Sequence, residues 1–130
     1  MNIQLGQYAG FCFGVDRAVS MVEEATKAGG TVVTLGPIIH NRHVVDRFQR
    51  MGVEVANSPE EVRPGSTVVL RAHGVPRQVE ETLAGLPVQV VDATCPFVKR
   101  IHQIAAEVPE DGLLLLAGRR EHPEVQGILG

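Results

Sequence analysis

The stretch 67–96 decides the fold; it reads TVVLRAHGVPRQVEETLAGLPVQVVDATCP. Two short apolar runs, 67–70 and 88–91, have the length and β-branched composition of strands. Between them, Pro76 begins a helical stretch that Gly85 ends. A strand, a helix and a second strand in this order predict a right-handed βαβ unit with parallel strands.

The same alternation continues on both sides of this stretch. Toward the N-terminus we expect strands at 3–5, 31–35 and 53–55, and helices at 15–28 and 41–51. Toward the C-terminus we expect a helix that Pro96 begins and a strand at 113–117. The runs 88–91 and 113–116 are apolar on both faces, which favours strands covered by helices on each side. The prediction is an α/β fold, with small parallel sheets flanked by helices.

Composition limits the function classes. The chain has 130 residues, of which 44% are hydrophobic, so one domain with a packed core is expected. Its formal net charge of −3 disfavours nucleic-acid binding, which usually requires a basic surface. No run of Lys or Arg suggests a membrane surface, and neither a signal peptide nor a membrane span is recognisable. We therefore expect a cytoplasmic chain whose cysteines stay reduced.

Chemically active side chains follow the expected strands. In open α/β sheets, ligands bind beyond the carboxyl ends of the strands. Five segments that follow expected strands carry two cysteines, three histidines and one glutamate: Cys12, His40, His73, Cys95, His122 and Glu124. The sequence therefore predicts that these six side chains meet at one rim of the sheet.

Each of these residues also has a simpler structural interpretation. A single cysteine is often a small buried apolar residue, but Cys12 and Cys95 both precede a helix start, where a thiolate is favoured. The histidines could be turn or cap residues, and Glu124 a first-turn helix residue. Taken together, three imidazoles at neighbouring strand ends favour an anion site. With only two cysteines, an ordinary four-thiolate cluster cannot form. The residues alone thus indicate an anion and a thiolate-bound metal at the rim of the sheet.

Two other functions fit the same residues. The chain could be a non-enzymatic α/β module that binds a phosphorylated metabolite through its histidines, with both cysteines in the core. It could also be a dithiol redox protein that uses Cys12 and Cys95, which requires the two sulfur atoms to approach bonding distance.

Five segments carry a resemblance to a known family. They are AGFCFGVDRA at 9–18, GPIIHN at 36–41, RAHGV at 71–75, DATCP at 92–96 and HPEVQG at 122–127. In order and spacing they resemble the 4-hydroxy-3-methylbut-2-enyl diphosphate reductases, the LytB family, which act last in the non-mevalonate isoprenoid pathway. The resemblance runs the whole length of the chain.

The resemblance implies a [4Fe–4S] cluster at the centre of three α/β lobes, with Cys12 and Cys95 as two of its three thiolate ligands. It implies that the substrate diphosphate is held by three histidines, His40, His73 and His122. Glu124 matches the acid of the family's proton relay. The implied reaction removes the allylic hydroxyl of (E)-4-hydroxy-3-methylbut-2-enyl diphosphate with two electrons and two protons, giving isopentenyl and dimethylallyl diphosphates. The implied partner is an electron donor such as ferredoxin or flavodoxin.

The resemblance also implies a division of the chain. Residues 1–12 are expected to form a strand that leads to the first cluster cysteine. Residues 13–95 match the first lobe and 96–130 the start of the second, and the third lobe is absent. We therefore expect an N-terminal portion whose site is completed by the remaining lobes, which carry the third cysteine and further substrate-binding groups.

Overall fold

A four-stranded parallel sheet forms the centre of the computed structural model, which describes residues 1–109 and 111–130. The strands are β1 (Val32–Leu35), β2 (Glu54–Ala56), β3 (Thr67–Leu70) and β4 (Gln89–Asp92), in the order β2-β1-β3-β4. The predicted parallel sheet is confirmed. From β1 the chain continues to β2 on one side of the sheet, and from β3 it continues to β4 on the opposite side. The direction of the strand order therefore reverses between β1 and β3. Ligands of open α/β sheets bind at such a reversal.

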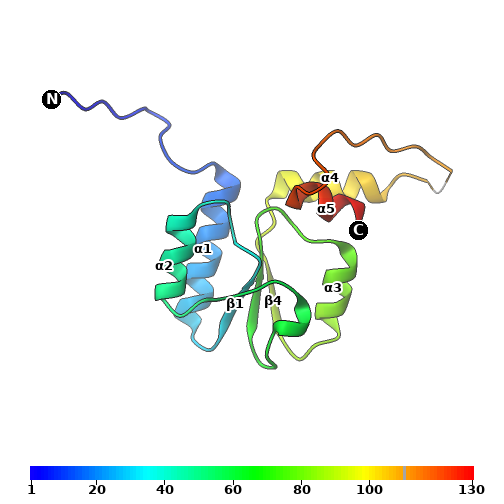
Figure 1. Cartoon of the computed structure of the whole chain (residues 1–130), viewed down its shortest axis with the longest axis horizontal. Helices are drawn as coiled ribbons and strands as arrows, with labels where there is room; N and C mark the ends of the chain where they lie inside the picture. The colour runs from blue at the N-terminus through cyan, green and yellow to red at the C-terminus, as the bar shows by residue number, and fades with distance from the viewer. Residues whose placement is uncertain (110) are drawn as a thin grey trace.

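Helices cover both faces of the sheet and one end of it (Figure 1). On one face lie α1 (Phe13–Ala28) and α2 (Arg42–Arg50). On the other lie the 3₁₀ turn η1 (Pro59–Glu61) and α3 (Arg77–Ala84). Two more helices, α4 (Pro96–Ala106) and α5 (Pro123–Leu129), pack together beyond the strand ends. A separate pair of helices therefore lies beyond the carboxyl ends of the strands.

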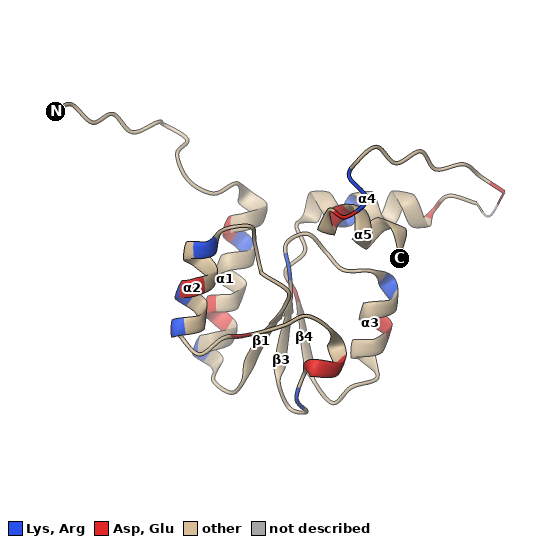
Figure 2. Ribbon diagram, in the orientation of Figure 1, with Lys and Arg blue, Asp and Glu red and all other residues tan. Residues whose placement is uncertain are grey.

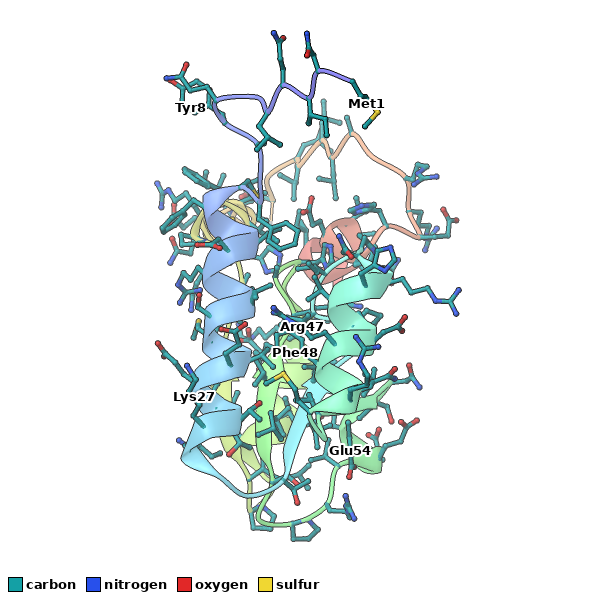
Figure 3. All side chains as sticks on the ribbon, turned by 90° about the vertical axis from the view of Figure 1, so that its left-hand side faces the viewer. Met1, Tyr8, Lys27, Arg47, Phe48 and Glu54 are labelled. Atoms are coloured by element: carbon teal, nitrogen blue, oxygen red, sulfur yellow. The ribbon has the colours of Figure 1, made fainter. Side chains whose placement is uncertain are left out.

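Alternate strand residues supply two apolar cores, one under each helical layer. Under α1 and α2, Val32 and Val69 pack with helix residues such as Val22 and Phe48. Figure 3 shows α1 and α2 side by side over the sheet, with Phe48 directed inward. Under α3, the intervening residues of β1 and β3 pack with Leu83. The period-2 alternation explains why β1 and β3, the two central strands, are buried on both faces.

Two expected strands are absent from the part of the chain that the structure describes. Residues 3–5 and 113–117 have no strand structure, and their apolar side chains are exposed, Ile3 by 75% and Leu115 by 84%. The predicted strands at 1–12 and 113–117 are thus wrong for this chain. Both segments run away from the sheet (Figure 1), and a strand requires a neighbouring backbone to satisfy its N–H and C=O groups.

The expectation for 88–91 is also corrected. β4 pairs only with β3, so it is an edge strand, and Val90 is 42% exposed. The run 88–91, in which three of four residues are valine, is therefore only partly covered.

Residues of both charge signs are intermixed along α1 and α2, as the ribbon colours of Figure 2 show. Arg47 of α2 donates to Glu23 of α1 at 2.9 Å and lies over the Phe48 ring, 5.0 Å from its centroid. Within the described ranges, no helix has the length and apolar character required to cross a membrane.

Candidate functional site

Three loops that leave the carboxyl ends of β1, β3 and β4 are hydrogen-bonded to one another. The Ala72 N–H donates to the Ile38 carbonyl at 3.1 Å, and the Cys95 N–H donates to the Ala72 carbonyl at 2.9 Å. These bonds continue the pairing of the strands past their ends. The loops carry His40, His73 and Cys95, so the predicted convergence of these residues at one rim is present.

A tight turn fixes His73 after β3. The Gly74 N–H donates to the Arg71 carbonyl at 3.0 Å, and the Arg71 Nε donates back to the Gly74 carbonyl at 3.1 Å. Gly74 has φ of +76°, and a Cβ at this position would lie 2.8 Å from Cε1 of His102. Glycine is therefore required here by both conformation and space. The turn leaves His73 only 9% exposed.

The three predicted substrate-binding histidines form one cluster. Ring centroids lie 4.3 Å apart for His40 and His73, 5.9 Å for His40 and His122, and 6.2 Å for His73 and His122. His40 immediately precedes Asn41, whose side chain caps α2 by accepting from the Val44 N–H at 3.3 Å. The cluster thus takes one imidazole from the β1 loop, one from the β3 loop and one from the start of α5.

The cluster disfavours positive charge at its centre. Burial, with the neighbouring His40, Arg71 and His122, lowers the pKa of His73 from 6.5 to about 4. His73 is therefore neutral at pH 7. Its Nδ1 atom is buried and, among the described residues, has no hydrogen-bond partner. A buried polar atom without a partner costs about 1–3 kcal/mol, which a bound ligand that hydrogen-bonds to it recovers.

His122 caps the helix that carries Glu124. Its Nδ1 accepts a hydrogen bond from the Glu124 N–H at 3.3 Å, and Pro123 occupies the first helical position of α5. Because Nδ1 acts as an acceptor, the ring proton of the neutral imidazole resides on Nε2. The free Nε2–H can then donate to an anion. Glu124 is half-buried in the first turn of α5.

Two hollows flank the histidine cluster. One, of about 340 Å³, is lined by His40, Arg119, Glu121, His122 and Pro123. The other, of about 290 Å³, is lined by His40 and His73 together with residues from the start of α1 and the β1 loop: Phe11, Val15, Ile39 and Asn41. His40 lines both hollows. Glu124 lines neither, so the structure brings together the three histidines but does not show the Glu124 carboxyl among them.

Both cysteines are helix N-cap residues and both are free thiols. Cys12 precedes α1 and is exposed, and Cys95 precedes α4 and is half-buried. The interpretation of both as core residues is therefore wrong. Cys95 lies directly against α1, because a Cβ built on Gly14 would come within 2.4 Å of its Sγ. Within 1–109 and 111–130, no group of three or more His, Cys, Asp or Glu side chains is arranged to hold a metal ion.

The structure adds residues that sequence reasoning missed. Arg119 lines the larger hollow beside two histidines. His102 lies between two glycines, since a Cβ on either Gly74 or Gly127 would come within 2.8 Å of its Cε1. It thereby joins α4, α5 and the His73 turn. Arg17 of α1 reaches the end of β4 and the loop that follows it. No local pattern signals these contacts, because their partners lie far away in the sequence.

Comparisons with known proteins identify the family of the chain. The model of the family described as LytB protein matches residues 3–130. A 4-hydroxy-3-methylbut-2-enyl diphosphate reductase from Aquifex aeolicus is 45% identical over 132 residues, covering 100% of this chain and 45% of that protein. The enzyme of the same name from Clostridioides difficile is 37% identical over 132 residues, covering 100% of this chain and 47% of its own length. The chain thus spans about half the length of the curated relatives it matches.

Solved structures show the same relationship. A structure of (E)-4-hydroxy-3-methyl-but-2-enyl diphosphate reductase, described as the terminal enzyme of the non-mevalonate pathway, superposes with a TM-score of 0.82 at 45% identity. The superposition covers 98% of this chain and 46% of that one. The Plasmodium falciparum reductase superposes with a TM-score of 0.88 at 30% identity, covering 95% of this chain and 39% of that one. With its family model matched almost end to end and its fold shared with these reductases, the chain belongs to the LytB family.

Proposed function

We propose that this chain forms part of a 4-hydroxy-3-methylbut-2-enyl diphosphate reductase. The proposed reaction replaces the allylic hydroxyl of the substrate by hydrogen, taking up two electrons and two protons and releasing water. The products are isopentenyl and dimethylallyl diphosphates. The observation that carries the proposal is the convergence of three imidazoles, His40, His73 and His122, around a buried nitrogen that has no partner among the described residues.

The histidine cluster suits a diphosphate better than a cation. Among the described residues, no group of three or more His, Cys, Asp or Glu side chains is arranged to hold a metal ion, although Glu121 lines the hollow beside His40 and His122. A neutral imidazole presents one N–H donor, and in His122 this donor is Nε2. Arg119 adds a positive charge to the wall of the adjoining hollow. We propose that these groups hold the diphosphate and thereby orient the allylic end of the substrate.

The donor chemistry of the two cysteines fits an iron–sulfur cluster. Two free thiols stand at helix N-termini, an environment that favours the thiolate form. Cys12 and Cys95 would hold two irons, and the third thiolate would come from the rest of the protein. When bound, a [4Fe–4S] cluster supplies electrons and an open iron site that acts as a Lewis acid toward the leaving oxygen.

Glu124 is the proposed proton donor to the departing hydroxyl. Hydroxide leaves poorly, so a positioned carboxyl group is expected to matter. Glu124 lies in the first turn of the helix that His122 caps, which ties the position of the acid to the position of a proposed diphosphate-binding residue. His122 therefore has two proposed roles, binding the anion and orienting the helix that bears Glu124.

The remaining parts of the proposal follow from family membership. Residues 13–95 would form the first of three lobes and 96–130 the beginning of the second. The other lobes would complete the site, and a donor such as ferredoxin or flavodoxin would supply electrons. Free thiols are the expected state in the cytoplasm, which is the proposed location.

Binding of inorganic pyrophosphate to the 130-residue chain tests the anion site. Replacing His73 by Phe should weaken binding about 10- to 100-fold, because a hydrogen bond to a charged group contributes roughly 1.5–3 kcal/mol. His43→Phe is the matched control, since His43 lies exposed on α2, outside the histidine cluster. Equal affinities in both variants and wild type would remove the cluster from the proposed diphosphate site.

Turnover by a full-length LytB protein that carries this segment tests the reaction itself. Under anaerobic conditions with a reduced donor, the two product diphosphates should accumulate. Pyrophosphate binding without any turnover would favour a non-enzymatic module that binds phosphorylated metabolites.

A further inference from the structure

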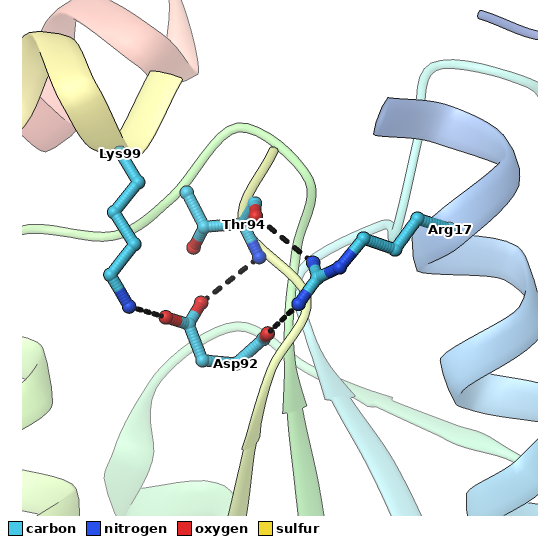
Figure 4. A network of polar contacts seen from close by, with 4 residues as sticks. All are labelled: Arg17, Asp92, Thr94 and Lys99. Carbon is cyan, nitrogen blue, oxygen red and sulfur yellow. Dashed lines mark hydrogen bonds and ion pairs between the residues drawn. The ribbon is translucent and has the colours of Figure 1, made fainter. Parts of the chain in front are cut away.

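Four residues from α1, α4 and the segment at the end of β4 form a polar network (Figure 4). Arg17 of α1 donates from Nη1 to the Thr94 carbonyl at 3.2 Å and from Nη2 to the Asp92 carbonyl at 3.4 Å. The Thr94 N–H donates to Oδ1 of Asp92 at 2.9 Å, and Lys99 of α4 pairs with Oδ2 of the same carboxylate. The network thus connects α1, the end of β4 and the start of α4.

The Arg17 contacts are tertiary rather than local. They join residues 77 and 75 positions apart, and their acceptors are main-chain carbonyls on either side of the buried Ala93. Arg17 has no salt-bridge partner among the described residues. Its guanidinium group instead donates to these two carbonyls. A guanidinium presents its donors in a fixed fork, which makes it suited to fixing the position of two acceptors at once.

The network is joined to both cysteine residues through the chain. Cys95 follows Thr94 directly and caps α4, while Cys12 caps the same helix that carries Arg17. The Cys95 backbone is bound on its other side, through its N–H to the Ala72 carbonyl at 2.9 Å. Arg17 therefore supplies the attachment toward α1, and the Ala72 carbonyl supplies the attachment toward β3. Between these attachments, the Cys95 Sγ rests against Gly14.

We propose that Arg17 is a positioning residue that sets the separation of the Cys12 and Cys95 thiols. It holds the loop that ends at Cys95 against the helix that begins after Cys12. Asp92 supports it by fixing the same loop through the Thr94 N–H and by tying that loop to α4 through Lys99. The two thiols are in this way arranged by the fold before any metal binds. For the proposed reductase, this arrangement is the template onto which the cluster is built.

Thiol cross-linking of the 130-residue chain tests this inference. A bismaleimide with an ethylene spacer reacts with one thiol and then with the second if the second lies within reach. The ratio of doubly to singly attached product, measured by intact mass, reports the separation of the thiols. Because it compares two products of one reaction, it is insensitive to the reactivity of the first thiol. It also needs neither cluster nor substrate, so failure of the proposed function would leave this readout unaffected.

The variants separate positioning from general stability. Arg17→Met should lower the ratio by roughly 10- to 100-fold, since small displacements of oriented groups have effects of this size. Arg17→Lys keeps the charge but loses the forked geometry, and should restore the ratio in part. The matched control is Arg47→Met, which removes another arginine contact onto α1, the one to Glu23, and should leave the ratio unchanged.

Circular dichroism at the reaction temperature establishes that each variant is folded. A folded Arg17→Met variant that cross-links like wild type overturns the proposal, as does an equal loss of cross-linking in Arg47→Met. If Arg17→Met does not fold, the cross-linking ratio of Arg17→Lys tests the proposal instead. A lowered ratio in folded Arg17→Lys supports the proposal, and a wild-type ratio overturns it.

Discussion

The closest approach in the candidate site, between Cys95 and α1, gives a quantitative prediction for Gly14→Ala. Gly14 is buried in the first turn of α1. An added Cβ would lie 2.4 Å from the Cys95 Sγ, 3.0 Å from its Cβ and 3.7 Å from its Cα. Rotation about χ1 could move the sulfur, but the Cys95 Cβ, 3.0 Å from the added Cβ, moves only with the backbone, which is held by its bond to the Ala72 carbonyl. The variant must therefore separate α1 from the loop that ends at Cys95.

Two opposing contributions set the expected change in the free energy of unfolding of the Gly14→Ala variant. Overpacking of a well-packed site typically costs about 1–3 kcal/mol. Alanine in a helix gains about 0.5–1 kcal/mol over glycine. We therefore expect the free energy of unfolding to fall by about 1 kcal/mol, and at most by about 2.5 kcal/mol. The cross-linking ratio of Cys12 and Cys95 should fall as well, which an ordinary loss of stability in a still-folded chain would not produce.

Urea unfolding of the 130-residue chain measures this change through the midpoint and slope of the transition. Gly85→Ala is the matched control. Gly85 lies at the C-terminus of α3 with helical φ and ψ, and its added Cβ would meet only the Thr82 carbonyl oxygen at an ordinary 3.5 Å. The control should gain about 0.4–1 kcal/mol. A Gly14→Ala variant that is as stable as Gly85→Ala, with unchanged cross-linking, would show that Cys95 does not lie against α1.

Three further predictions concern the histidine cluster, the proposed proton donor Glu124, and the cysteines proposed to bind the iron–sulfur cluster. Between pH 6.5 and about 4, His73 resists protonation in the folded state while the unfolded chain takes up the proton, so stability should decrease as pH falls. His73 should account for about 3 kcal/mol of the decrease in the free energy of unfolding, and His73→Phe should abolish this share of the pH dependence. An identical pH dependence of stability in the variant and the wild type would contradict the lowered pKa of His73. In a full-length LytB protein with this segment, Glu124→Gln should retain substrate binding and lose turnover by about 10²–10⁴-fold; near-normal turnover with a small change in melting temperature would leave Glu124 only a helix-forming role. Anaerobic reconstitution of the 130-residue chain should yield no stable [4Fe–4S] centre, because Cys12 and Cys95 leave two irons without thiolates; near four irons per monomer after desalting would contradict this.

The central sheet could be predicted from the sequence because local and tertiary preferences agree there. The β-branched runs of β1 and β3 are buried on both faces, so their composition and their environment point to the same structure. The histidines and Cys95 were predicted to converge because the carboxyl ends of parallel strands share one edge. This geometric rule holds for His40 and His73 without any knowledge of side-chain contacts.

The absence of strands at 3–5 and 113–117 and the long-range contacts of Arg17 and His102 could not be predicted, for two different physical reasons. The segments 3–5 and 113–117 have strand-like composition, but a strand exists only with a partner, and the sequence pattern does not state which backbone lies alongside. The Arg17 network and the position of His102 between Gly74 and Gly127 depend on contacts between distant elements. The sequence around Arg17 does not indicate that its contacts lie 75 and 77 positions away.

The attachment of Arg17 to the loop after β4 has a consequence for the order of folding. The helix that begins after Cys12 precedes the first strand, and Cys95 follows the last, so all four strands lie between the two thiols in sequence. Contacts of long sequence separation form only after the intervening loop entropy has been overcome. The elements that carry the two thiols therefore take up their relative positions late in folding. In the proposed reductase, cluster assembly is accordingly expected after β4 has joined the sheet.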